Sequence, residues 1–310
     1  MDEVIEFRIP EENIREYLGE QVTISTNKKV GAIKAKKGSN LYKKIIDLQK
    51  LFYSNSKSFF FGWDIVRNYS KDEVEKAEYF LGKIEKVIGC CGQEGGTNYN
   101  DSNACFFCGG GGKQTSDLIL DRSKLPKSDK VDIWKTFAGE IGISEKFADI
   151  LLMNGYPSDG IGLIRKGNGP GNVVPGWFQL KIETFFYKIA AKTEAGTNPF
   201  KIDNDVINSN EKILSALEIA ASKSDKLGIY LCPFGHTIGL NLLSEIFLNK
   251  SHGDFLISWT KECIGVRRGF LRPEHCLIFN SAFYRLKEKY KLTGLKFEIA
   301  HLVKEKNSEC

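Results

Sequence analysis

Apolar residues recur along the chain at two spacings, one typical of helices and one typical of strands. Helical spacing begins after Ser39, a good N-cap residue, and gives one stripe of apolar residues: Leu41, Ile45, Leu48 and Phe52. We therefore expect an amphipathic helix whose apolar stripe lies in a core. The spacing of Ser70 and Glu73 is that of a capping box and predicts a second helix through about residue 83. A further helix is expected over residues 205–222.

Two parts of the chain repeat one plan of strand, helix, glycine turn and strand. In the first part, residues 140–143 alternate like a strand, and Ser144 is a suitable N-cap. The helical face that follows ends at Gly155, and a strand returns over residues 161–164.

The second part follows the same plan near the C-terminal end. Residues 276–279 form the expected strand, Asn280 is the N-cap, and Gly294 precedes a strand over 295–303. Phe283 takes the place that Phe147 has in the first copy. A matching pair of segments stands before the two copies, residues 132–136 and 254–260.

These patterns predict a mixed α/β (α+β) fold built from two similar modules, a possible duplication. A glycine- and proline-rich break over residues 167–172, followed closely by Pro175–Gly176, indicates a linker or a long turn. The expected modules are therefore residues 1–168 and 176–310, each ending in a strand–helix–strand unit. The first carries a cysteine-rich insertion that resembles a zinc knuckle.

Composition supports a folded protein. The 310 residues are 42% hydrophobic, 12% aromatic and 27% charged, which excludes disorder and a collagen-like chain. There is no uncharged apolar run of about 18 residues, and the acidic start lacks the regions of a signal peptide. We expect a cytoplasmic protein that does not span a membrane. Eight cysteines are too few for a disulfide scaffold, so a metal site is the better interpretation.

The cysteine cluster, residues 90–108, is the strongest chemical signal. Cys105 and Cys108 are three apart with Gly109 next, a spacing at which two thiolates reach one tetrahedral zinc ion. Cys90 and Cys91 would complete a four-cysteine site, although adjacent side chains tend to diverge and a standard pair needs a cysteine at the position of Ile88. A three-thiolate site and inert reduced cysteines remain alternatives. The glycines after Cys108 disfavour a redox helix, and the lack of Ser or Thr after Lys113 disfavours a phosphate loop.

Other candidate groups are weaker. Cys232 and His236 supply two soft ligands in the second module, with a tight turn as the plainer interpretation. Three arginines, Arg267, Arg268 and Arg272, suit a partner-facing loop or a solvated one. His301 lies in an apolar strand, which is typical of a core histidine. No nucleophile, metalloprotease or dinucleotide motif is present, so we expect a non-enzymatic protein.

The net charge of +5 is distributed unevenly. Residues 28–57 hold nine lysines against one acid, Asp47, a local charge of 9 − 1 = +8. Such a face is suited to nucleic acid or an acidic protein partner, and a solvated helix surface is the alternative.

Several short motifs carry a resemblance to a known family. They are Tyr69–Glu73 with Ala77–Glu78, the cysteine cluster, Leu118–Asp121 with Leu125–Pro126, and Asp132–Ile133 leading to Ile143–Phe147. In these, the chain resembles the double-CXXCG-motif and related immunity proteins of bacterial polymorphic toxin systems. The resemblance covers about residues 69–166, with a weaker echo over 232–303.

The resemblance implies a cytoplasmic, non-enzymatic protein that binds and neutralises a cognate bacterial toxin. The second family cysteine pair maps onto Cys105 and Cys108, whereas the first is not matched, because Ile88 replaces one cysteine and Cys90 stands beside Cys91. The alternative function is a zinc-containing nucleic-acid-binding regulator that uses the lysine-rich helix.

Overall fold

The computed structural model describes most of the chain as two compact units. The first, here the N-terminal unit, comprises residues 1–76 and 198–219, and the second, here the barrel unit, comprises 77–197 and 220–310. The described residues are 1–19, 29–55, 57–102, 104, 112–127, 130–167, 172–183, 185–194, 200, 229–231, 237–239, 242–250, 255–264 and 274–303. The boundary that the sequence predicted between two modules, at residues 168 to 176, lies inside the barrel unit.

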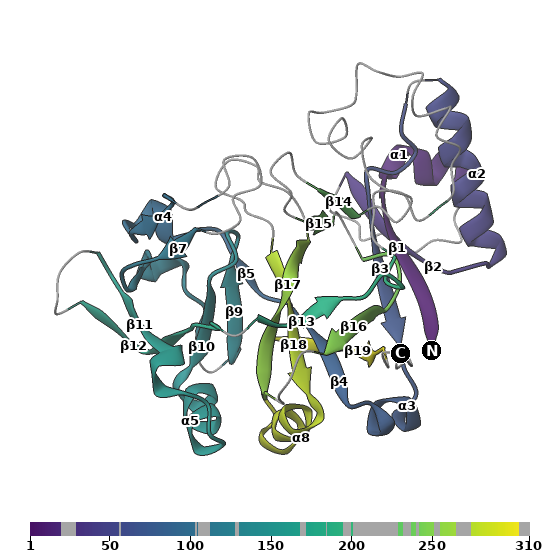
Figure 1. Ribbon diagram of the computed structural model, residues 1–310. Helices are drawn as coiled ribbons and strands as arrows, with labels where there is room; N and C mark the ends of the chain where they lie inside the picture. Colours follow the sequence, from purple (N-terminus) through teal and green to yellow (C-terminus); the bar gives the residue numbers. More distant parts are fainter. Residues whose placement is uncertain are drawn as a thin grey trace. The chain divides into compact units, whose positions relative to one another are not determined.

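The N-terminal unit is an antiparallel sheet in the order β2-β1-β3 with helix α2 packed on one face (Figure 1). Alternation along β1 places Ile5, Phe7 and Ile9 in the core, where Ile45 of α2 joins them. Ser39 caps α2 as predicted, since its hydroxyl accepts the N–H of Tyr42 at 3.2 Å. The bounds are β1 Asp2–Pro10, α1 Glu11–Asn13, β2 Val30–Lys36, α2 Asn40–Ser54, β3 Gly62–Asn68 and α3 Lys71–Lys76.

The predicted capping box at α3 is confirmed, but the predicted end of that helix is wrong. Glu73 Oε2 accepts the N–H of Ser70 at 2.8 Å, and Ser70 Oγ accepts the N–H of Glu73 at 3.3 Å. The helix ends at Lys76 and not near residue 83, because the apolar run that follows is strand β4, Tyr79–Ile84. β4 pairs on both edges, so a central place in a sheet overrides the helical pattern.

The centre of the barrel unit is a closed six-stranded barrel in the order β13-β16-β19-β4-β18-β17, closed by pairing of β13 with β17. Its interior is apolar, and Tyr79, Tyr187, Leu248 and Ile278 are among the buried residues there. Helix α8 connects β18 to β19, as the sequence predicted. The bounds are β13 Phe185–Ile189, β14 Ile229–Leu231, β15 Thr237–Gly239, β16 Ile246–Lys250, β17 Ile257–Ile264, β18 Glu274–Asn280, α8 Ser281–Tyr290 and β19 Leu295–Leu302.

The second sheet of the barrel unit is a half-barrel in the order β5-β9-β10-β12-β11-β8. Helix α5 connects β10 to β11, so the first predicted strand–helix–strand unit is also present (Figure 1). The bounds are β5 Val87–Ile88, α4 Gly92–Gly95, β6 Tyr99–Asn100, β7 Lys113–Gln114, β8 Leu118–Ile119, β9 Ile133–Thr136, β10 Ile141–Ser144, α5 Glu145–Met153, β11 Ile161–Arg165 and β12 Val173–Leu180.

The two sheets share one pairing plan, position by position. From β5 to β8 in the half-barrel, and from β13 through β17, β18, β4 and β19 to β16 in the barrel, the pairings are parallel, three times antiparallel, and parallel. In the half-barrel, β12 lies in the sheet between β10 and β11, the two strands that α5 connects. In the barrel, β4 lies in the same way between β18 and β19, the two strands that α8 connects. β4 precedes the half-barrel strands in the chain yet pairs within the barrel, where Figure 1 shows it in blue beside the yellow-green β18. β12 precedes the barrel strands yet pairs within the half-barrel.

The interpretation of Pro175–Gly176 as part of a linker is wrong. Both residues lie inside strand β12, where the pairing with β11 shifts register between Leu163 and Arg165. Gly176 has a φ of +74°, which glycine adopts without strain, so the pair forms an irregularity in a continuous strand. Residues 168–171 and the helix predicted over 205–222 lie outside the described residues.

Candidate functional site

The lysine-rich segment divides into a paired part and an unpaired part. Three lysines of β2 and the turn after it form ion pairs with acids of β1: Lys34 with Glu6 at 3.4 Å, Lys36 with Asp2 at 2.8 Å, and Lys37 with Glu3 at 2.5 Å. Burial by itself would raise the pKa of Glu3, but Lys37 and Arg67 beside it lower the pKa overall. These lysines therefore stabilise the sheet, and the local charge available to a partner is smaller than the sequence suggests.

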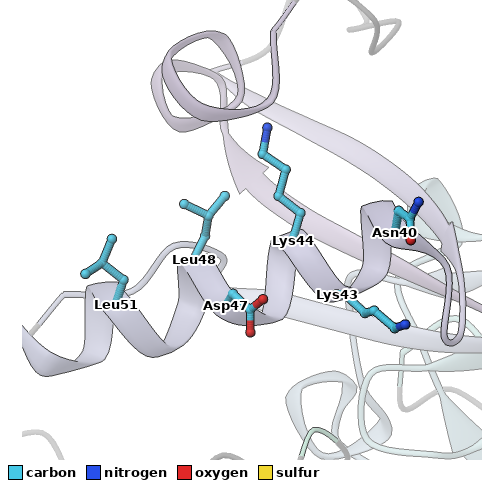
Figure 2. A pocket seen from close by; sticks show the side chains of 6 residues that line it. All are labelled: Asn40, Lys43, Lys44, Asp47, Leu48 and Leu51. Carbon is cyan, nitrogen blue, oxygen red and sulfur yellow. The ribbon is translucent and has the colours of Figure 1, made fainter.

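The lysines of α2 are placed differently. Lys43, Lys44 and Lys50 are exposed, and none of them forms an ion pair with any residue that the structure describes. Figure 2 shows Lys44 on the same side of the helix as two leucines, Leu48 and Leu51. Together with Asn40 and Asp47 these residues line a surface hollow of about 430 Å³. The predicted apolar stripe of α2 is confirmed, because Ile45 is buried and Leu41, Leu48 and Phe52 pack against the core.

The two described cysteines of the cysteine cluster lie directly after β5 and point to different surroundings. Cys90 belongs to the apolar core of the half-barrel, together with Ile88, Leu118 and Trp134. Burial raises the pKa of Cys90 to about 11, and the neighbouring Cys91 adds to the rise. This environment favours the neutral thiol.

Cys91 precedes the short turn of helix α4. Burial raises the pKa of Cys91, while hydrogen bonds from the backbone N–H groups of Glu94 and Gln93 act in the opposite direction. Amides directed at a sulfur atom favour a thiolate, the form that binds zinc. Burial outweighs these amides, so the pKa of Cys91 is raised overall, but the amides make Cys91 the better-placed zinc ligand of the two.

Glu140 joins the cysteine-bearing segment to the half-barrel. Its Oε1 atom accepts the N–H of Gly92 at 3.1 Å and the hydroxyl of Tyr99 at 2.5 Å, and its Oε2 accepts the hydroxyl of Thr136. Tyr99 belongs to β6, which pairs with β7, and Cys105 and Cys108 lie between these strands in the sequence. We did not predict this role of Glu140 from the sequence. The only signal was the tight turn that Gly139 (φ +97°) permits between Thr136 and Glu140.

Two further carboxylates, both buried, are also occupied by contacts within the barrel unit. Asp132 accepts hydrogen bonds from Ser144 Oγ at 2.9 Å and from the N–H and hydroxyl of Thr293 at 2.9 and 3.0 Å. Glu298 pairs with Lys83 Nζ at 2.5 Å. Donors that fill the lone pairs of a buried carboxylate stabilise its charge, so these acids hold strands and loops together.

The other predicted residues are placed as follows. Cys105, Cys108, Cys232, His236, Arg267, Arg268 and Arg272 lie outside the described residues. His301 lies in β19, stacked on Phe247 and 3.2 Å from Glu245 Oε2. Among the described residues, no group of three or more His, Cys, Asp or Glu side chains is positioned to hold a metal ion.

The fold and its accessible chemistry define a mostly β protein with a basic helix on its N-terminal unit. Comparison of the chain with protein-family models, with curated proteins and with solved structures found no match. Within the described part of the chain, no helix has the length and apolar character needed to cross a membrane.

Proposed function

We propose that this chain is a non-enzymatic, immunity-type protein that binds and neutralises a cognate bacterial toxin in the cytoplasm. The observation that carries the proposal is the contrast between buried and accessible charge. The buried carboxylates Asp132 and Glu298 and the half-buried Glu140 are each occupied by internal donors, whereas the lysines of α2 face outward without described acidic partners. Charge presented on a helix surface suits binding to a macromolecule.

Zinc is the proposed cofactor, with a structural role. Of the candidate ligands Cys90, Cys91, Cys105 and Cys108, the position of Cys91 supports a site, because amide donors approach its sulfur. Cys90 fits less well, since its thiol belongs to an apolar core cluster. The three-thiolate alternative, Cys91 with Cys105 and Cys108, is therefore the one we favour. An ion held there would order the loop between β6 and β7.

We further infer that the barrel unit arose by duplication, with exchange of one strand between the copies. Support comes from the matched strand orders and from equivalent N-caps, because Ser144 Oγ accepts the N–H of Phe147 and Asn280 Oδ1 accepts the N–H of Phe283. The rings of Phe147 and Phe283 are 5.6 Å apart. A contact between equivalent residues is expected beside a pseudo-twofold axis.

The alternative function is a zinc-containing nucleic-acid-binding regulator. Lys43, Lys44 and Lys50 favour it, because lysines on one helix that form no ion pair with a described residue can bind phosphates. Such binding would weaken steeply with salt. If no DNA or RNA binds at low salt, this alternative is excluded.

Co-expression tests the proposed function. The full chain would be expressed together with the protein encoded beside its gene, and growth of the host would be measured with and without the chain. We expect restored growth and a complex that copurifies. A neighbouring protein that is not toxic, or toxicity that the chain does not relieve, would contradict the proposal.

A further inference from the structure

The outward face of α2 combines charge with apolar surface. Lys44, Leu48 and Leu51 follow one another at helical spacing, and Figure 2 shows their side chains on one side of the helix. Leu51, in the last turn of the 15-residue helix, is 55% exposed. A shallow, open hollow of about 430 Å³ lies beside these residues, against which an apolar side chain of a partner can pack.

The charges around this hollow are complementary to acids. Lys43 and Lys44 are consecutive on the helix, Lys50 lies nearly two turns further on, and none of the three is paired within the described residues. The acids of the neighbouring strand β1 are already engaged by Lys34, Lys36 and Lys37. Among the described residues, the acids of β1 are thus already paired, and carboxylates of a partner molecule are suited to pair with these lysines.

We propose that this face of α2, defined by Lys43, Lys44, Lys50 and Leu51, binds an acidic amphipathic segment of a partner protein. Carboxylates of the partner pair with the lysines, and one apolar side chain of the partner enters the hollow beside Leu48 and Leu51. The identification of the partner as a protein deepens the proposed toxin-binding function and rests on it.

Two features favour a protein over nucleic acid. Asp47 lies on α2 between Lys44 and Lys50 and lines the same hollow, where its carboxylate would repel a phosphate backbone. Burial of the Leu51 side chain contributes to the free energy of binding only if the partner covers it with an apolar group. A phosphate backbone offers no such group. A protein segment can place a carboxylate beside each lysine and a donor beside Asp47.

The test uses defined probes and the full chain. The first probe is a fluorescein-labelled helical peptide with glutamates and leucines at helical spacing. The second is the same peptide with alanine in place of leucine, and the third is a labelled duplex DNA. Binding is followed by fluorescence anisotropy. The variants are Lys43→Glu/Lys44→Glu and Leu51→Ser, with Lys76→Glu on the exposed surface of α3 as the matched control.

We expect the leucine-containing peptide to bind best. The double charge reversal should weaken its binding roughly tenfold or more, because each exposed ion pair contributes modestly and reversal adds repulsion. Leu51→Ser should reduce binding of the leucine peptide to that of the alanine peptide, and Lys76→Glu should change neither. Circular dichroism spectra that match the parent protein show that the variants are folded.

Two results would overturn the proposal: equal binding of both peptides to all variants, or tighter binding of DNA that Lys43→Glu/Lys44→Glu abolishes. The latter would assign the face to nucleic acid. If the peptide binds but co-expression gives no protection, α2 is a protein-binding surface and only the toxin function is overturned. Protection retained by both α2 variants would overturn the surface and leave the toxin function standing.

Discussion

Thr136 and Thr260 occupy the same place in the two sheets of the barrel unit and accept the same hydrogen bond. The hydroxyl of Thr136 accepts the backbone N–H of Glu140 at 3.2 Å, and that of Thr260 accepts the N–H of Cys276 at 2.9 Å. Both threonines are fully buried, at 0% exposure. In each sheet the bond fixes the point at which the chain enters the strand that leads to the helix.

A second pair of threonines repeats this correspondence. Thr97 Oγ1 accepts the N–H of Ile119 at 2.8 Å, and Thr193 Oγ1 accepts the N–H of Phe247 at 2.9 Å. Ile119 in β8 and Phe247 in β16 hold equivalent places in the two sheets. The polar groups of the two sheets are therefore satisfied in the same way, although the segments that supply the threonines differ.

Replacing either of the first two threonines by valine should destabilise the protein. Thr136→Val and Thr260→Val each leave a buried N–H without its acceptor, so we expect a loss of about 1–3 kcal/mol in the free energy of unfolding. Urea denaturation measures the loss. The exposed Thr115→Val is the control, with an expected change within about 0.5 kcal/mol. A change as small for Thr260→Val as for the control would mean that the bond is of no consequence.

The two N-caps should differ in strength. Ser144→Ala and Asn280→Ala should each lower the free energy of unfolding by about 1 kcal/mol. The loss should be larger for Ser144, because its hydroxyl also donates to the buried carboxylate of Asp132 at 2.9 Å. Thermal unfolding gives the comparison, and Asn280→Asp, which keeps the acceptor, should stay close to the parent protein. Equal losses would contradict the special role of the Asp132 contact.

The pairing of β4 within the barrel and of β12 within the half-barrel should keep the halves of the chain together after cleavage. A protease site inserted between Lys166 and Asn172 separates the two predicted modules covalently, but each sheet still holds a strand from the other module. We expect the cleaved chain to elute as one species in gel filtration and to separate in denaturant. Halves that separate without denaturant would rule out the interlocked arrangement.

Zinc content tests the proposed metal site. Cys105→Ser should release roughly one zinc per chain and speed amide exchange over residues 90–102, because the ion would order this segment. Cys310→Ser, far away in the sequence, should do neither. Elemental analysis of protein purified without chelator gives the stoichiometry. A value near zero, or zinc that Cys105→Ser leaves unchanged, would show that the cysteines are reduced and without metal.

Cys90 should make the metal-free protein sensitive to alkali. Its pKa is raised from 9.0 to about 11, chiefly by burial, so the folded state keeps a proton that the unfolded state loses first. The corresponding stability is complete below about pH 9 and is lost as the pH rises through about 11. Denaturation midpoints across this range should fall less steeply for Cys90→Ala than for the parent. Parallel curves would contradict burial of the thiol.

The sequence alone was sufficient to predict helix starts and short strand–helix–strand units, because interactions between neighbouring residues determine them. Ser39, Ser144 and Asn280 each cap the helix expected after them, because a cap depends on residues within one turn. Both strand–helix–strand units follow from the same local signals. The apolar stripe of α2 was likewise predictable, since helical spacing alone decides which side chains share a face.

Only the tertiary structure decided where each strand pairs and which charges are already occupied. Residues 79–84 were expected in a helix, but they form β4, because β18 and β19 bind both of its edges from more than 190 residues further along the chain. The charge of the lysine-rich segment is reduced by acids of β1 that only the sheet register places opposite Lys34 and Lys36. Glu140 became recognisable as an anchor only through Gly92 and Tyr99. Local propensity is carried by neighbouring residues, whereas strand partners and ion pairs depend on contacts between distant segments, which spacing along the sequence does not encode.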